Sequence, residues 1–239
     1  LTTWDKAIEK QEQLISKKEA LKKGLMQQLL TGKKRFPGFT DKWKEVKLGE
    51  CLNEKPKYGI NAAAVEFSSK LPKYLRITDI EENGTFTKSK FKSVDNPDSS
   101  QYYLTKGDLV FARTGNTTGK TYLYQESDGK LVFAGFLIKV SPNQQILKPE
   151  FLKFFTEIKR YKNWVTVMSV RSGQPGINGN EYSLLPLSLP TIKEQDKIVD
   201  LLSSLTITIH SHLNELELLK KQKKGLMQKL LTGVIRVKV

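Results

Sequence analysis

The sequence predicts an α+β fold: a globular domain with a mixed sheet and helices, flanked by two long helices that form an antiparallel coiled coil. One observation is a repeat, because the stretch 22–32 returns as 223–233 with one change in eleven positions. Both copies close long amphipathic stretches, and the chain between them has short apolar runs separated by turn residues, as strands do. We therefore expect a helical arm over residues 1–35, a globular domain over residues 36–193 and a second helical arm over residues 194–239.

The first arm is predicted to be one long helix. Between Trp4 and Leu30 the apolar residues recur at spacings of three, four and seven, with Lys and Glu between them, which is the pattern of an amphipathic helix. At 1.5 Å per residue it spans about 40 Å, longer than most helices in compact domains. Thr31 and Gly32 supply a helix end, and Pro37 prevents continuation.

The middle of the chain carries the signals of a sheet with a helix packed on it. A turn at residues 127–130, with Asp128 before Gly129, predicts a hairpin between two of the strands. A run rich in Phe from Pro149 to Trp164 predicts a helix. The predicted strands are Lys73 to Ile77, Asp108 to Ala112, Thr121 to Gln125, Leu131 to Val140 and Ser183 to Leu189.

The second arm is predicted to begin at Thr191, which caps the helix with Glu194 as its capping-box partner. Its apolar stripe runs from Ile198 to Leu230, a length of about 58 Å. A central domain cannot cover either stripe along its whole length, so the two helices should pack on each other. They should be antiparallel because the chain leaves one helix, builds a domain and enters the other. A partner chain in place of one helix stays open.

The repeat spacing of 201 residues is too long for a solenoid, whose units span about 20 to 50 residues. The stretch therefore marks one duplicated module. The similarity extends upstream, since Trp4, Ile8 and Ile15 correspond to Leu205, Ile209 and Leu216. The run before the second copy would have its counterpart ahead of the first residue, so we expect a longer protein with another domain on that side.

Composition restricts the class of partner. The chain of 239 residues has a formal net charge of +15, densest in the two arms. Such an excess implies an anionic partner such as DNA, RNA or a membrane surface, with a merely soluble basic protein as the alternative.

A single cysteine, Cys51, excludes an internal disulfide, and no Cys/His cluster has zinc spacing. No apolar run approaches the roughly 20 residues of a membrane span, so we expect a cytoplasmic protein without a membrane role.

A glycine-rich loop at residues 115–121 resembles a phosphate-binding P-loop. The P-loop pattern needs glycine at position 114, where the chain has Thr, and the loop lies between two predicted strands instead of opening a helix. Nucleotide hydrolysis is therefore not supported. What remains is a loop rich in glycine and hydroxyls between Arg113 and Lys120, whose backbone amides and cations could meet DNA phosphates or base edges.

A second basic loop, residues 169–178, places Arg and Gln among glycines that let backbone approach a ligand. Lys88, Lys90 and Lys92 alternate at strand spacing and so should share one face. Plain solvation is the alternative for both segments. We predict as DNA-binding residues Lys57, Arg76, Lys88, Lys90, Arg113, Thr114, Asn116, Thr118, Lys120, Arg171, Ser172 and Gln174.

No catalytic and no metal-binding residue is assigned. Pro97 and Asp98, followed by Asp128, fit a nuclease metal pattern only with a long gap. His210 and His212 are two apart on a helix and point in different directions. The sequence contains no hydrolytic triad and no methyltransferase motif of the Asn/Asp-Pro-Pro-aromatic kind.

The sequence resembles the specificity subunit of type I restriction-modification systems over nearly its whole length. The stretch 187–198 is similar to the exit from a target recognition domain in that family, and the repeated Lys-Gly-Leu-Met-Gln-x-Leu-Leu-Thr-Gly helix end is its second specific feature. Segments that also look like this family's recognition domains are 107–115, 134–136 and 173–177.

The resemblance implies a central helix, the second of two target recognition domains, and a distal helix. Subunits of this family have two such domains and no catalysis of their own. They select a bipartite sequence in double-stranded DNA and dock two methyltransferase subunits and two restriction/translocase subunits. S-adenosylmethionine is then expected only in the methyltransferase, and no cofactor in this chain.

Three alternatives stay open beside this interpretation. The chain could be a coiled-coil adapter that binds a protein or another non-DNA ligand through its middle domain. It could be an enzyme with an unrecognised site. Its helices could also self-associate, in which case a homodimer would present two identical domains about a two-fold axis.

Overall fold

The computed structural model describes residues 2–87, 89–170 and 173–235 and has the predicted α+β fold. The chain divides into two compact units. One is helical and combines residues 1–28 with 200–239, and the other is the globular domain of residues 29–199.

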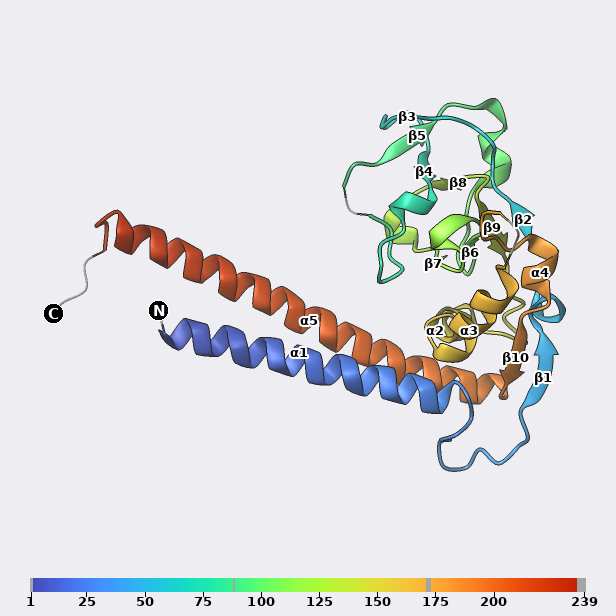
Figure 1. The fold of residues 1–239 in the computed structure, drawn as a ribbon, viewed down its shortest axis with the longest axis horizontal. Helices are drawn as coiled ribbons and strands as arrows, with labels where there is room; N and C mark the ends of the chain where they lie inside the picture. Colours follow the sequence, from blue (N-terminus) through green and yellow to red (C-terminus); the bar gives the residue numbers. More distant parts are fainter. Residues whose placement is uncertain (1, 88, 171–172, 236–239) are drawn as a thin grey trace. The chain divides into compact units, whose positions relative to one another are not determined.

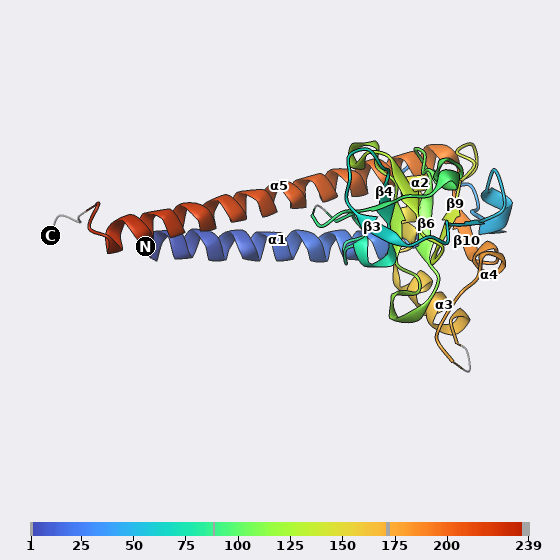
Figure 2. The ribbon, with the colours of Figure 1, turned by 90° about the horizontal axis from the view of Figure 1, so that it is seen from above.

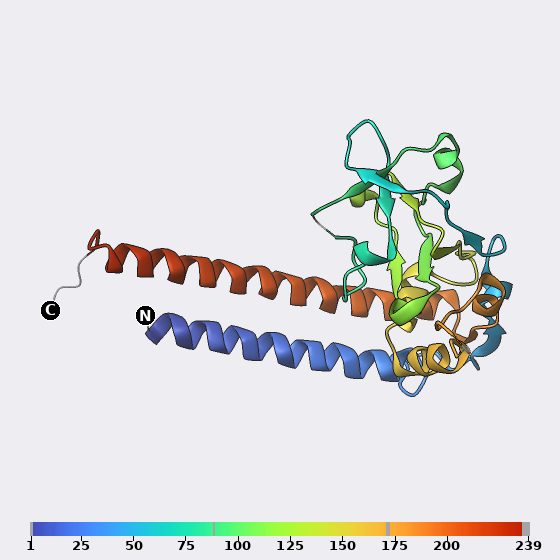
Figure 3. The same cartoon turned by 45° about the horizontal axis from the view of Figure 1, so that its top comes forward.

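Two long helices make the helical unit, as predicted. Helix α1 spans Thr2–Leu29 and helix α5 spans Ile192–Leu231. They run antiparallel and side by side in every view (Figure 1, Figure 2 and Figure 3). Ion pairs join them between Asp5 and Lys223 and, at 2.9 Å, between Glu12 and Lys220. Within the described part of the chain, no helix is both long and apolar enough to cross a bilayer.

Along each of the two helices, the less exposed residues recur at spacings of three and four, as they do in a coiled coil. Ile15 and Leu216 are equivalent in the repeat, and both are buried. Gln11 and His212 are equivalent too, and the Gln11 amide Nε2 lies 3.1 Å from His212 Nδ1 and donates to Glu215 Oε2 at 2.8 Å. Because equivalent residues meet there, an approximate two-fold axis relates the two helices near this pair.

The described residues of the globular domain form three sheets. The smallest is an antiparallel pair of β1 (Lys44–Lys47) and β10 (Pro186–Leu189), which joins the two ends of the domain. The antiparallel sheet has the order β2-β9-β6-β7, from Lys57–Tyr58, Leu137–Val140, Leu109–Ala112 and Thr121–Leu123. The mixed sheet has the order β3-β5-β4-β8, from Ala64–Glu66, Lys92–Val94, Lys73–Leu75 and Leu131–Phe133, with β4 and β8 parallel.

Short helices complete the domain, and its main core packs between the two larger sheets. Core side chains include Leu75 and Phe133 from the mixed sheet and Val110 and Leu137 from the antiparallel sheet. The α-helices are α2 (Pro149–Phe155), α3 (Lys159–Met168) and α4 (Gly179–Ser183). The 3-10 helices are Leu48–Cys51, Ile77–Asp79, Pro97–Tyr102, Gly115–Thr117 and Glu126–Asp128.

Two predictions about the strands are wrong, one for the run 131–140 and one for the hairpin at Gly129. The run 131–140 is not one strand, because it breaks around Gly135 into β8 and β9, which belong to different sheets. The predicted hairpin at Gly129 is only a turn, with a φ of 78° at that glycine, since β7 and β8 also lie in different sheets. The other four predicted strands are confirmed but are shorter than predicted, as Lys73–Leu75, Leu109–Ala112, Thr121–Leu123 and Pro186–Leu189.

The predicted helix from Pro149 to Trp164 is in fact two helices, α2 and α3. The chain turns at Thr156, whose hydroxyl donates to the Lys153 carbonyl at 2.7 Å and lies 2.8 Å from the Thr121 hydroxyl of β7. A side chain that bonds to its own backbone and to a neighbouring strand favours a break in the helix at that point.

The start of α5 is held by a buried carboxylate. The Thr191 hydroxyl accepts a hydrogen bond from the Glu194 amide at 3.4 Å, which confirms the predicted cap. The Glu194 carboxylate does not complete a capping box. It accepts from Arg35 Nε at 2.9 Å, from Arg35 Nη2 at 2.6 Å and from Trp43 Nε1 at 3.2 Å. This cluster joins the segment that follows α1 to the segment that begins α5.

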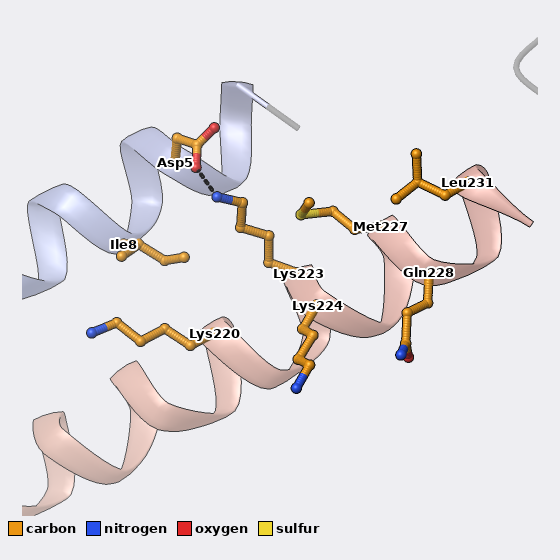
Figure 4. A pocket seen from close by; sticks show the side chains of 8 residues that line it. All are labelled: Asp5, Ile8, Lys220, Lys223, Lys224, Met227, Gln228 and Leu231. Carbon is orange, nitrogen blue, oxygen red and sulfur yellow. Dashed lines mark hydrogen bonds and ion pairs between the residues drawn. The ribbon is translucent and has the colours of Figure 1, made fainter.

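The two copies of the repeat lie in different environments. Leu30 of the first copy is fully buried, whereas its equivalent Leu231 is 83% exposed. Figure 4 shows Leu231 and Met227 at the open end of the helical unit. They line a hollow of about 420 Å³ together with Asp5, Ile8, Lys220, Lys223, Lys224 and Gln228.

This difference predicts unequal effects of one substitution at equivalent positions. Leu30→Ala should lower the free energy of unfolding by about 2–5 kcal/mol, the usual effect of a cavity at a buried leucine. Leu231→Ala is the matched control and should change it by less than about 0.5 kcal/mol. Urea unfolding followed by tryptophan fluorescence measures both. Equal effects at the two positions would contradict the assigned environments.

Candidate nucleic-acid interface

Three loops of the globular domain converge on Arg113, at the end of β6. Its amide donates to the Phe136 carbonyl at 3.1 Å, and its carbonyl accepts from the Ile177 amide at 2.9 Å. Thr114 and Gly176 form a β-bridge beside it. The two glycine-rich loops singled out in the sequence, 62 residues apart at this bridge (176 − 114), therefore lie against each other.

The Arg113 side chain lies over an aromatic ring. Its guanidinium carbon is 4.8 Å from the centre of the Tyr58 ring, at the edge strand β2. The Tyr58 hydroxyl accepts a hydrogen bond from the Gly179 amide at 3.0 Å. Among the residues that the structure describes, no carboxylate pairs with Arg113, so its five N–H donors remain available to a ligand.

The loop after Arg113 uses its backbone amides internally. The Gly115 amide donates to Pro175, Gly119 to Ala112 and Lys120 to Thr117, each at 2.9 Å. The Thr118 amide and hydroxyl both donate to the Gly115 carbonyl. These four amides are therefore engaged within the protein, and the expectation that backbone amides of this loop meet DNA phosphates stays a prediction.

Buried aromatic side chains form hydrogen bonds to both ends of this loop. The Tyr182 hydroxyl donates to the Ala112 carbonyl and the Tyr161 hydroxyl to the Gly119 carbonyl, each at 2.9 Å. Burial raises the pKa of both hydroxyls, so both stay protonated as donors. Phe111 packs on Tyr182 with ring centres 4.5 Å apart. Buried hydroxyls thus anchor both ends of the loop.

Several predicted basic residues have carboxylate partners. Arg76 forms a bidentate pair with Asp79, with bonds of 2.9 and 2.6 Å, and Asp79 is buried. Lys57 pairs with Glu54, and Lys120 pairs with Glu82 at 2.6 Å. Arg76 therefore holds the start of the 3-10 helix that follows β4. The carboxylates beside Lys57 and Lys120 offset part of their positive charge. A role in DNA binding stays a prediction for all three residues.

The predicted row of lysines is also wrong as a strand face. Lys90 has a φ of 58°, which is not strand conformation, and Lys92 is the one of the two described lysines that lies in a strand, where it pairs with Glu66. Lys90 itself is exposed. Lys88, Arg171 and Ser172 lie outside the described residues.

The domain also exposes two aromatic side chains, on residues linked to Arg113, that were not among the predicted DNA-binding residues. Phe136 is 61% exposed and Tyr58 is 43% exposed. Asn116 and Gln174, both predicted, are exposed at the meeting of the two loops, where Gln174 Nε2 would be 2.9 Å from a Cβ on Gly115. We call Tyr58, Arg113, Asn116, Phe136 and Gln174 the Arg113 surface. An unpaired arginine, two amides and two aromatic rings suit contact with base edges and sugars.

Comparison with known proteins identifies what this domain resembles. The family model described as type I restriction modification DNA specificity domain matches residues 40–221. Two proteins of Methanocaldococcus jannaschii, named for the specificity subunits of the type I restriction enzymes MjaX and MjaVIII, are 28% and 22% identical over 144 and 194 residues. These matches cover 59% and 80% of this chain but only 34% and 42% of the relatives, so the chain spans less than half their length.

Solved structures share the fold. A crystal structure of a type I restriction-modification S subunit from M. genitalium superposes with a TM-score of 0.62 at 16% identity, over 95% of this chain and 57% of that one. The HsdS subunit from Thermoanaerobacter tengcongensis superposes with a TM-score of 0.54 at 14% identity, over 95% and 56%.

Proposed function

The chain belongs to the family of type I restriction-modification DNA specificity proteins, and we propose that it selects one half of a bipartite DNA target and docks the subunits that act on it. The Arg113 surface is the single observation that carries the DNA half of this proposal. It joins an internally hydrogen-bonded loop, an arginine that pairs with no carboxylate of the described residues, and exposed side-chain amides. Specific readout of base edges needs side chains of this kind in fixed positions.

The helical unit supports the docking half of the proposal. Its two helices carry the same sequence module and are related by an approximate two-fold axis near Gln11 and His212. Two similar modules can present two similar surfaces, so we propose that they bind methyltransferase subunits, and through them the restriction/translocase subunits. The chain itself then needs no catalytic group and no cofactor, because S-adenosylmethionine binds the methyltransferase. We propose the cytoplasm as its location.

The exposed residues near the end of α5 are a candidate contact surface for a second recognition domain. Leu30 and Leu231 have the same local sequence, yet only Leu231 is exposed. We propose that a second recognition domain covers the Leu231 end, as the family plan implies. Self-association through the apolar stripes is not required, because each stripe already faces the other helix of the same chain. The chain alone should therefore read one half-site as a monomer.

The DNA proposal predicts a base-specific effect at Arg113. Arg113→Ala should cost about 1–3 kcal/mol in binding to the target half-site and relax the preference at one position. Lys90→Ala is the control, since an exposed lysine on a phosphate should weaken all sequences alike and reduce the salt slope. Fluorescence anisotropy with duplexes at several salt concentrations measures both. Binding that is independent of salt and sequence in the unaltered chain would refute the proposal.

The docking proposal predicts a stable complex with the cognate methyltransferase subunit. The two purified proteins should elute together from a sizing column, and sedimentation of the chain alone should show a monomer across concentrations. Leu218→Glu places a charge at a leucine that is 58% exposed on α5 and should weaken the complex, whereas Leu184→Glu, at a 49% exposed leucine of the globular domain, should not. Failure of the unaltered protein to co-elute would count against docking.

A further inference from the structure

The backbone at Arg113 is fixed on both sides. Its amide and its carbonyl are both bonded, to Phe136 and to Ile177. The carbonyls on either side of the adjoining loop, at Ala112 and Gly119, accept bonds from the buried tyrosines beneath it. Hydrogen bonds therefore anchor the backbone at Arg113, and the direction of its side chain depends on what the guanidinium contacts.

The contact that sets this direction is the Tyr58 ring. A guanidinium 4.8 Å from a ring centre is within the range of a cation–π interaction. No acidic side chain competes for it among the residues described. Arg76 shows the other arrangement, because the Nε and Nη2 edge of its guanidinium is engaged with the Asp79 carboxylate.

Tyr58 is itself held in place. Its hydroxyl accepts from the Gly179 amide, and β2 pairs with β9 through Tyr58 and Ile138. The next residue, Gly59, packs so closely on the turn before β9 that a Cβ there would lie 2.2 Å from the Ala134 carbonyl oxygen. This close approach fixes the strand that carries the ring.

Resting on the proposed function, we infer that Arg113 reads a guanine through its N7 and O6 atoms and that Tyr58 is the positioning residue for this contact. Guanine is the base that presents two acceptors side by side in the major groove, and the arginine fork matches them with two parallel donors. A flexible arginine loses much side-chain freedom on binding, and a guanidinium already resting on a ring loses less.

Selection from a randomised duplex pool, with the full chain bound to its cognate methyltransferase, tests the inference. The unaltered chain should show a guanine at one position that Arg113→Lys loses, although Arg113→Lys keeps its salt-dependent binding. Tyr58→Phe keeps the ring and should keep that preference. Tyr58→Leu keeps apolar bulk without a π face and should reduce the preference for that guanine over the other bases about three- to tenfold, a larger factor than any loss of affinity for random DNA.

Replacement of that guanine by 7-deazaguanine removes the N7 acceptor alone. It should weaken binding by the unaltered chain at least severalfold and have no further effect on Arg113→Ala. A selected motif whose guanines all tolerate 7-deazaguanine, or whose preference survives in Tyr58→Leu, would overturn the inference while the proposed function stands. If no motif emerges from the selection, the proposed function fails first. Should Tyr58→Leu unfold, Arg113→Lys and the modified base still decide the question.

Discussion

The rest of the structure depends on one buried carboxylate, that of Glu194. It is fully inaccessible to solvent, and a charge in that position is stable only with partners. Arg35 supplies a bidentate partner from the segment after α1, and Trp43 adds a third bond. The entry and the exit of the globular domain are thereby held together. A domain whose two ends meet can be inserted between two helices that run antiparallel.

At the Arg113 surface, too, contacts within the protein hold the backbone in the absence of a ligand. Two loops that are distant in sequence share a β-bridge at Thr114 and Gly176, and two buried tyrosines bind the carbonyls of the first loop. Among described residues, every buried side-chain nitrogen or oxygen has a hydrogen-bond partner. A recognition surface with a fixed backbone can change its specificity through side chains alone, since the scaffold does not depend on them.

The sequence was sufficient where the signal is local or periodic. The repeat and its apolar spacing predicted both helices within two residues, and the glycine-rich loops around Arg113 and Gln174 were found from composition. Contacts between distant segments were not predictable. The break near Gly135, the ring of Tyr58 beneath Arg113 and the support from Tyr182 all depend on pairing that a single sequence does not encode locally. For Arg76 a signal was present, because an acidic residue three positions later is within reach of an ion pair.

The most direct measurement is photocrosslinking from p-benzoylphenylalanine placed at position 136 or position 67 of the chain bound to labelled target duplex. Phe136 lies on the Arg113 surface and is 61% exposed, whereas Phe67 is 47% exposed and packs beside Phe91 in the region of the mixed sheet. DNA should be crosslinked from position 136 and not from position 67, and unlabelled target should compete. Crosslinking from position 67 with none from position 136 would show that DNA binds another face of the domain.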